Sequence, residues 1–280
     1  MSHKRFAKIL VFDSGVGGLS ILQSVRQQFP DCTLFYGSDN AAFPYGTKAE
    51  AELIERVDDV LHQLQKTTQA DIIIIACNTA STVALPRIRG RFSQPVIGVV
   101  PAIKPAAKIS QTKTIGLLAT PGTVKRDYTE KLIKEFATHC HIIRVGSNEL
   151  VHLVEKKLRG ETIDPSQLKP IVYPFTECLD IDTIVLACTH FPLLKQELQQ
   201  TLPAITYWVD SGEAIARRTG YWLDQLKLRP LDMTEQSCDL MKNSGPVSSV
   251  AFFTRQDKNL AALKTTLQQL SIPNIAILNK

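Results

Sequence analysis

The sequence predicts an α/β protein whose parallel sheets are covered by helices on both faces. Three observations support this fold class: short β-branched apolar runs end at polar or glycine-rich turns, segments with helical period separate them, and one strand-and-turn pattern occurs twice. At about 150 residues per domain, a chain of 280 residues is long enough for two domains.

The expected strands are four to six residues long and almost continuously apolar, which is typical of strands buried on both faces. They are Ile9–Phe12, Thr33–Tyr36, Ile72–Ala76, Val96–Val100, Thr114–Leu118, Ile142–Val145, Thr183–Ala187 and Val250–Thr254. Apolar residues with helical spacing between them predict helices over 19–29, 53–64, 194–202 and 215–226. The proline-containing joints at 95–105 and 203–211 are candidate crossings between domains.

The run Asp71-Ile-Ile-Ile-Ile-Ala-Cys77-Asn-Thr resembles Asp182-Thr-Ile-Val-Leu-Ala-Cys188-Thr-His. An earlier strand with a polar turn precedes each run. Because both copies share the Ala-Cys-polar ending, and not only apolar strand composition, we interpret the chain as two related halves.

Charge and hydropathy exclude several classes of protein. The formal net charge is +5 and is spread along the chain, so the sequence indicates no nucleic-acid partner. No apolar run approaches the roughly 18 residues of a membrane span. The first apolar run stops at Asp13, which is too short for a signal-peptide core. We therefore expect a cytoplasmic protein without a membrane partner.

In the cytoplasm the six cysteines are expected to be reduced. None has Cys-x-x-Cys spacing, and His139-Cys140-His141 offers few ligands and no second cluster, so we expect no metal site. Four cysteines are expected to pack in the core or lie at the surface: Cys32, Cys140, Cys178 and Cys238.

Ligands of open α/β sheets bind beyond the carboxyl ends of the strands. Four expected strand ends carry polar groups there: Asp13-Ser14, Cys77-Asn78-Thr79, Thr120 with Thr123, and Cys188-Thr189-His190. If the halves face one another, Cys77 and Cys188 meet across a cleft. Both lie where a strand is expected to turn into a helix, and the free amides and dipole there would lower a thiol pKa from about 8.5.

A matched pair of thiols suits the inversion of a stereocentre. One thiolate removes a proton from one face of a carbon atom and the opposite thiol returns a proton to the other face. A single nucleophilic cysteine would give no reason for the duplicate.

The glycine-rich turn after Asp13 departs from Gly-x-Gly-x-x-Gly at Ser20, and Asp13 would repel a phosphate. We therefore expect Asp13 to bind an ammonium group or a catalytic base, with a helix cap as the alternative. We expect His190 to tune Cys188 or supply protons; an ordinary surface histidine is the alternative. The loop at 40–46 is expected to close over a ligand.

Over about residues 8–225 the sequence resembles the glutamate racemase family, within the cofactor-independent aspartate/glutamate racemase superfamily. The motifs are Phe-Asp-Ser-Gly-Val-Gly-Gly-Leu at 12–19, Pro44-Tyr45-Gly46, Ala-Cys-Asn-Thr-Ala at 76–80, Thr-Pro-Gly-Thr at 120–123, Leu-Val-Glu at 153–155, and Leu-Ala-Cys-Thr-His-Phe-Pro at 186–192. The resemblance implies two pseudo-symmetric α/β domains with the active site in the cleft between them.

It also implies interconversion of L- and D-glutamate without a cofactor or metal, for peptidoglycan synthesis and hence cell shape. Members are often homodimers. The family topology returns the C-terminal residues to the first domain, which gives domains of 1–97 plus 210–280 and of 98–209, with a late helix near 260–270.

Carried over by motif, the catalytic residues are Cys77 and Cys188, assisted by Asp13 and His190 respectively, with Glu155 near the second base. The family often has proline before Leu-Val-Glu, and His152 stands there instead. The residues that match substrate-contacting positions are Ser14, Pro44, Tyr45, Gly46, Asn78, Thr79, Thr120, Thr123 and Thr189.

Two alternatives stay open. The first is another superfamily member that acts on aspartate, a hydantoin or maleate, although the Pro-Tyr-Gly loop favours glutamate. The second is a thiol-based redox or metal-responsive protein, in which Cys77 and Cys188 would pair or bind a metal.

Overall fold

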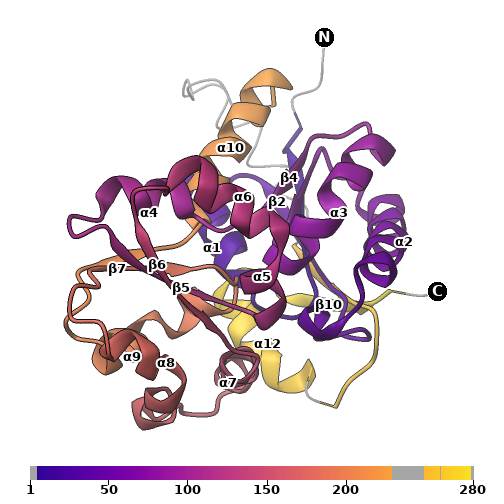
Figure 1. The fold of residues 1–280 in the computed structure, drawn as a ribbon. Coiled ribbons are helices and arrows are strands. Elements are labelled where there is room, and N and C mark those ends of the chain that lie inside the picture. Colours follow the sequence, from indigo (N-terminus) through magenta and orange to yellow (C-terminus); the bar gives the residue numbers. More distant parts are fainter. Residues whose placement is uncertain (1–4, 229–248, 259, 279–280) are drawn as a thin grey trace, which may run out of the picture.

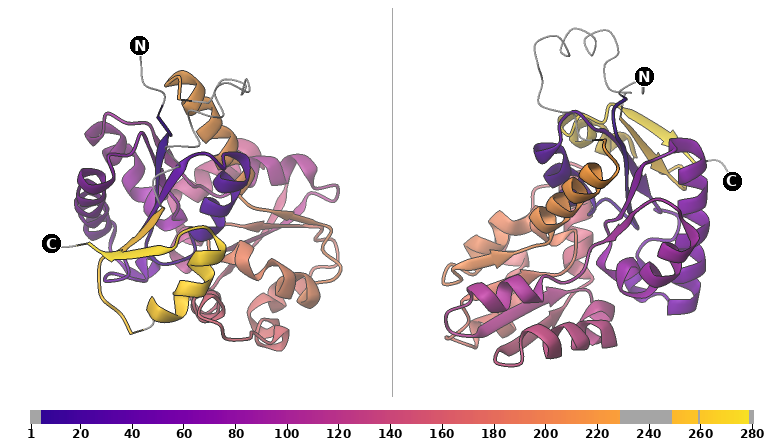
Figure 2. Two further views of the ribbon diagram at one scale, coloured as in Figure 1. Left: turned by 180° about the vertical axis from the view of Figure 1, so that it is seen from behind. Right: turned by 90° about the horizontal axis from the view of Figure 1, so that it is seen from above.

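The computed structural model describes residues 5–228, 249–258 and 260–278, so the expected core or surface position of Cys238 lies outside the described residues. The chain forms two sheets, with six strands in the first and four in the second. The first sheet takes its strands from both ends of the described chain and the second from its middle (Figure 1). The two halves lie against each other, each with its own helices (Figure 2).

The first sheet has the order β10-β9-β2-β1-β3-β4, and all its neighbouring strands are parallel. Its strands are β1 (Lys8–Asp13), β2 (Thr33–Ser38), β3 (Ile72–Ile75), β4 (Val96–Gly98), β9 (Val250–Phe253) and β10 (Asn274–Ile277). The accompanying helices are α1 (Leu19–Gln28), η1 (Tyr45–Thr47), α2 (Glu50–Thr68), α3 (Asn78–Arg91), α10 (Gly212–Gln225) and α12 (Leu260–Gln269).

The second sheet has the order β6-β5-β7-β8 and is also parallel. Its strands are β5 (Thr114–Ala119), β6 (His141–Gly146), β7 (Thr183–Leu186) and β8 (Tyr207–Val209). Its helices are α4 (Ile103–Ile109), α5 (Pro121–Lys125), α6 (Asp127–Phe136), α7 (Glu149–Leu158), η2 (Pro165–Gln167), α8 (Lys169–Thr176), η3 (Phe191–Leu194) and α9 (Lys195–Thr201).

Alternate side chains of the central strands enter different cores because successive strand residues point to opposite faces. Ile9 and Val11 of β1 pack with α1, α10 and α12, whereas Leu10 and Phe12 pack with α2 and α3. In the second sheet one core contains α7, α8 and α9 and the other contains α4 and α6. The α/β class and the burial of the central strands on both faces are therefore confirmed.

The two sheets repeat one topology. The order β2-β1-β3-β4 in the first sheet matches β6-β5-β7-β8 in the second, with strands taken in the same sequence along the chain. The two aspartates of the repeated motif also correspond. Asp71 accepts the backbone N–H of Lys8 at the start of β1, and Asp182 accepts those of Gln111 and Thr112 just before β5. The repeat therefore places Cys77 and Cys188 after equivalent strands.

Some details differ from the sequence-based expectations. The expected strand in the joint at 95–105 is present as β4, but β8 in the joint at 203–211 and the edge strand β10 were not expected. β6 is an edge strand with a largely exposed or half-buried surface, so it is not buried on both faces.

Among the described helices, none is both long and apolar enough to cross a membrane.

Candidate active site

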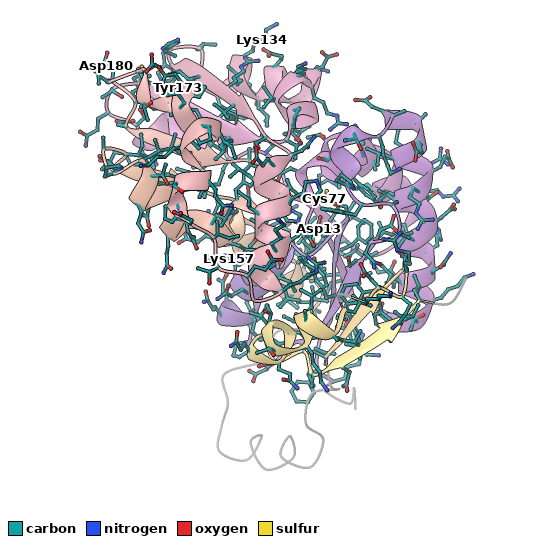
Figure 3. The ribbon with its side chains drawn as sticks, turned by 90° about the horizontal axis from the view of Figure 1, so that it is seen from below. Asp13, Cys77, Lys134, Lys157, Tyr173 and Asp180 are labelled. Carbon is teal, nitrogen blue, oxygen red and sulfur yellow. The ribbon has the colours of Figure 1, made fainter. Side chains whose placement is uncertain are left out.

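The carboxyl ends of the central strands of both sheets border one small cavity. Figure 3 shows Asp13 and Cys77 where the two halves of the chain meet. The cavity is lined by Asp13, Ser14, Phe43, Pro44, Tyr45, Gly46, Cys77, Asn78, Thr79, Thr120, Asn148, Val151, Cys188, Thr189 and His190. The two candidate thiols thus border the same space, Cys77 from the first sheet and Cys188 from the second, and each is 6% exposed.

The cavity is narrow. The volume open to the centres of water molecules is about 20 Å³, which is room for about one water. An amino acid is larger than this space, so its binding requires that the lining side chains or the two halves move apart.

Cys77 follows β3 and is the N-cap residue of α3. Its Sγ lies 3.8 Å from the hydroxyl oxygen of Ser14. Burial and the nearby carboxylate of Asp13 raise the pKa of this thiol well above its ordinary value. The sequence predicted a lowered pKa from the helix N-terminus, and that prediction is wrong for Cys77 because desolvation and a like charge outweigh the helix amides.

Asp13 ends β1 and is completely buried beside Cys77. One carboxylate oxygen accepts the backbone N–H of Ser14 at 2.7 Å and the other accepts that of Gly18 at 2.6 Å. Burial raises the pKa of Asp13, and the positive field of His190 opposes that rise. The carboxylate therefore holds the glycine-rich turn before α1, as in the helix-cap alternative, and at the same time lies next to a candidate base.

Cys188 belongs to a different environment. Its Sγ lies 3.7 Å from Nδ1 of His190, and Nε2 of that ring lies 2.9 Å from Oε1 of Glu155. Cys188 precedes the short 3₁₀ turn η3, and α9 begins only at Lys195, so the expected helix N-terminus directly after this cysteine is absent from the described chain. The nearest polar partner of this sulfur is instead the imidazole.

The His190–Glu155 pair is buried and charged. Burial alone would lower the pKa of His190, but hydrogen bonds to Cys188 and Glu155 raise it well above its ordinary value. Burial would likewise raise the pKa of Glu155, yet bonds from His190, the Val16 N–H and Arg159 lower it to about 2. A protonated imidazole therefore lies 3.7 Å from the sulfur of Cys188.

The glycine-rich turn of the first half contacts the second half at this site. A Cβ atom on Gly17 would lie 2.2 Å from Nδ1 of His190, and one on Gly15 would lie 2.5 Å from Oε1 of Glu155. The Val16 N–H donates to the same Glu155 oxygen at 2.9 Å. The glycines are therefore required because the first half approaches the histidine–carboxylate pair at backbone distance.

Several polar groups could orient a ligand. Nδ2 of Asn78 is buried and has no hydrogen-bond partner in the described structure. The hydroxyl oxygens of Thr79 and Thr120 lie 3.4 Å apart on the cavity wall. The Thr120 hydroxyl in turn donates to that of Thr123 at 3.0 Å. An unpaired buried donor is costly, so Asn78 is suited to an acceptor on a bound molecule.

The structure brings the expected site residues together with two exceptions. Thr123 and Glu155 lie behind the cavity wall and contact it through Thr120 and His190. Two lining residues, Asn148 and Val151, lie outside every segment that the sequence indicated, and Phe43 lies within the expected loop at 40–46 but was not singled out. Asn148 follows β6 by two residues, so the strand-end rule that found the other polar groups could have found it. No group of three or more acidic, cysteine or histidine side chains within 5–228, 249–258 and 260–278 could hold a metal ion.

The fold and the site define an α/β protein with two matched parallel sheets and a pair of thiols in a shared interior cavity. A family described as Asp/Glu/Hydantoin racemase matches residues 19–219, and the chain belongs to this family.

Named relatives extend over most of the chain. It is 53% identical to the glutamate racemase of Pectobacterium carotovorum over 224 residues, which cover 80% of this chain and 79% of the relative. It is 42% identical to that of Glaesserella parasuis over 271 residues, 97% of both chains. The crystal structure of Escherichia coli glutamate racemase in complex with L-glutamate and the activator UDP-MurNAc-Ala aligns over 98% of both chains, with a TM-score of 0.89 and 44% identity.

Proposed function

We propose that this chain is a glutamate racemase that interconverts L- and D-glutamate with two cysteines and no cofactor. The observation that carries the proposal is the shared cavity, which Cys77 and Cys188 enter from equivalent strands of the two sheets. The glutamate racemases among its relatives, at 42–53% identity, support the choice of substrate.

In the proposed reaction one sulfur starts as a thiolate and takes the proton from the α-carbon. The electron pair of the broken C–H bond stays on that carbon, and the opposite thiol then gives its proton to the other face. The raised pKa of Cys77 makes it the resting thiol, and Cys188 has the charged imidazole of His190 beside it. In the reverse direction the two sulfurs exchange these roles.

The α-proton of an amino acid is a very weak acid, so fixed donors must stabilise the negative charge that develops. We assign substrate carboxylates to the backbone amides and hydroxyls of the lining residues, which include Ser14, Gly46, Asn78, Thr79 and Thr189. Asp13 is suited to the ammonium group or to Cys77 itself. Glu155 acts through His190.

We further propose that the halves open and close during turnover as domains of 1–97 plus 210–280 and of 98–209. The division is supported by the strands, since those of the first sheet come from 8–98 and 250–277 and those of the second from 114–209. The enzyme would supply D-glutamate for peptidoglycan in the cytoplasm, as a homodimer. Complementation of a bacterial strain that requires D-glutamate tests the role, and light scattering tests the oligomeric state.

The deciding experiment incubates purified protein with D- or L-glutamate in heavy water, without pyridoxal phosphate and with metals removed. We expect optical rotation to decay to zero while deuterium enters the α-position. Aspartate in place of glutamate should be turned over far more slowly. Loss of activity after removal of metals, or racemisation without solvent exchange, would contradict the two-base mechanism.

A further inference from the structure

A second buried carboxylate, that of Asp39, lies next to the cavity but does not line it. Asp39 directly follows β2 and is completely buried. Its two oxygens receive the guanidinium of Arg56, with Nε at 2.8 Å and Nη2 at 2.6 Å. The hydroxyl of Thr254 also donates to it at 2.7 Å. Helix α2 and the end of β9 thus converge on this one side chain.

The fourth donor comes from the loop that lines the cavity. The hydroxyl of Tyr45 donates to Asp39 at 2.7 Å, and Tyr45 is 1% exposed. Because the O–H of Tyr45 is donated to Asp39, Tyr45 has no side-chain donor left for a ligand. The orientation of the Tyr45-Gly46 backbone toward the cavity therefore depends on where the ring is anchored.

Asp39 is also bonded to β1, the strand that ends at Asp13. The backbone N–H of Asp39 donates to the carbonyl oxygen of Asp13 at 2.9 Å. A short chain of bonds consequently leads from Asp13, beside Cys77, through Asp39 to the ring of Tyr45. This chain of bonds fixes the position of the Tyr45-Gly46 loop relative to the strand that ends at Asp13.

The carboxylate of Asp39 is ionised. Burial alone would raise its pKa, but the bonds from Arg56, Tyr45 and Thr254 outweigh burial and lower the pKa. A fully satisfied buried charge is weak evidence for stability but good evidence that one geometry is specified. The guanidinium side is half-open, since the Arg56 side chain is 35% exposed.

We propose that Asp39 and Arg56 are positioning residues that hold the Tyr45-Gly46 backbone in the orientation that binds a carboxylate group of the substrate. The inference rests on the proposed racemase function and deepens it. Neither residue lines the cavity, so their effect passes through Tyr45 and falls on ligand binding.

The test compares steady-state KM and kcat for glutamate in wild type, Tyr45→Phe, Asp39→Asn and the double variant, with thermal melts of each. Tyr45→Phe removes only the hydroxyl. We expect each single variant to raise KM about tenfold and to change kcat by less than about threefold, because uniform binding is lost. The effects of the two single variants should not multiply in the double variant, since both variants act on the same hydrogen bond between Tyr45 and Asp39.

Glu55→Gln is the matched control. Glu55 precedes Arg56 on α2 and forms an exposed pair with Arg87, so its variant should leave KM unchanged. A folded Tyr45→Phe with wild-type KM overturns the inference, and so does a double variant whose effects multiply. If Asp39→Asn fails to fold, Tyr45→Phe decides alone. A wild type that racemises no glutamate refutes the proposed function, and the inference falls with it.

Discussion

Glu155 and His190 form a buried pair in which only the histidine borders the cavity. Nε2 of His190 lies 2.9 Å from Oε1 of Glu155, and the Val16 N–H from the other half donates to the same oxygen. The carboxylate of Glu155 therefore links His190 of one half to the glycine-rich turn of the other. Nη1 of Arg159 donates to the other carboxylate oxygen of Glu155, Oε2, at 2.6 Å.

Replacing either cavity thiol tests the two-base assignment. We expect Cys77→Ser and Cys188→Ser each to lower kcat/KM by about 10²–10⁴, the usual contribution of a positioned acid or base. The two directions must fall equally in kcat/KM, because the enantiomers have equal free energy. Polarimetry measures both rates. The control is Cys178→Ser, because Cys178 is half-buried and does not line the cavity. A Cys77 or Cys188 variant with near-normal rates in both directions would refute the two-base assignment.

The pH dependence of folding stability tests the His190–Glu155 pair. The pKa of Glu155 falls from 4.5 to about 2 in the folded protein, so its stabilisation is complete above about pH 4.5 and is lost as pH falls toward 2. The pKa of His190 is raised from 6.5, so its stabilisation is complete below pH 6.5 and is lost as pH rises through the folded value.

Glu155→Gln should therefore lower the free energy of unfolding most between about pH 4.5 and 6.5, by about 3 kcal/mol. At pH 3 the loss of unfolding free energy should be smaller, because part of the stabilisation by ionised Glu155 is already gone in the wild type. Urea titrations at pH 3 and pH 6 measure the difference. Glu161→Gln, an exposed neighbour, should change little at either pH. A loss for Glu155→Gln that is the same at both values would show that the ion pair is not its cause.

A single methyl group tests the contact between the halves. Gly17→Ala would place a carbon 2.2 Å from His190, so we expect a loss of activity of at least about tenfold, since small misplacements of catalytic groups are costly. The matched control is Gly90→Ala in α3, where nothing lies within 4 Å of the added carbon. That variant should keep full activity and gain about 0.5–1 kcal/mol of stability. Full activity in Gly17→Ala would mean that His190 is free to move.

Tying the halves together tests the need for opening. Arg126 of the second half pairs with Glu50 of the first at 3.1 Å. In the double variant Glu50→Cys/Arg126→Cys, a bis-maleimide with an internal disulfide should lower activity at least about tenfold, because the narrow cavity admits about one water. A reductant that cleaves the linker should restore the activity. Each single-cysteine variant controls for other adducts, and a fully cross-linked sample with unchanged rates would contradict the need for opening.

Much of this arrangement was accessible from the sequence, since long apolar strands and their polar ends follow local rules. The expected central strands and the meeting of Cys77 with Cys188 at one cavity required only periodicity and the repeat. The edge strands β8 and β10 were missed because they are short and half-exposed. The Val16–Glu155 bond and the Asp39 cluster join segments far apart in the chain, and local patterns carry no information on such contacts. The pKa of Cys77 is raised mainly by burial, and a position at a helix N-terminus does not by itself indicate how deeply a thiol is buried.

The near-complete enclosure of both sulfurs has a practical consequence. Each cysteine is only 6% exposed, so we expect a small alkylating reagent to modify the thiols mainly when the halves move apart. The rate of modification would then report how often the halves open, as hydrogen exchange reports local unfolding. Mass spectrometry of samples taken over time, with the peptides that contain residues 77 and 188 resolved, would measure the modification rate of each thiol and hence the rate at which the two halves open.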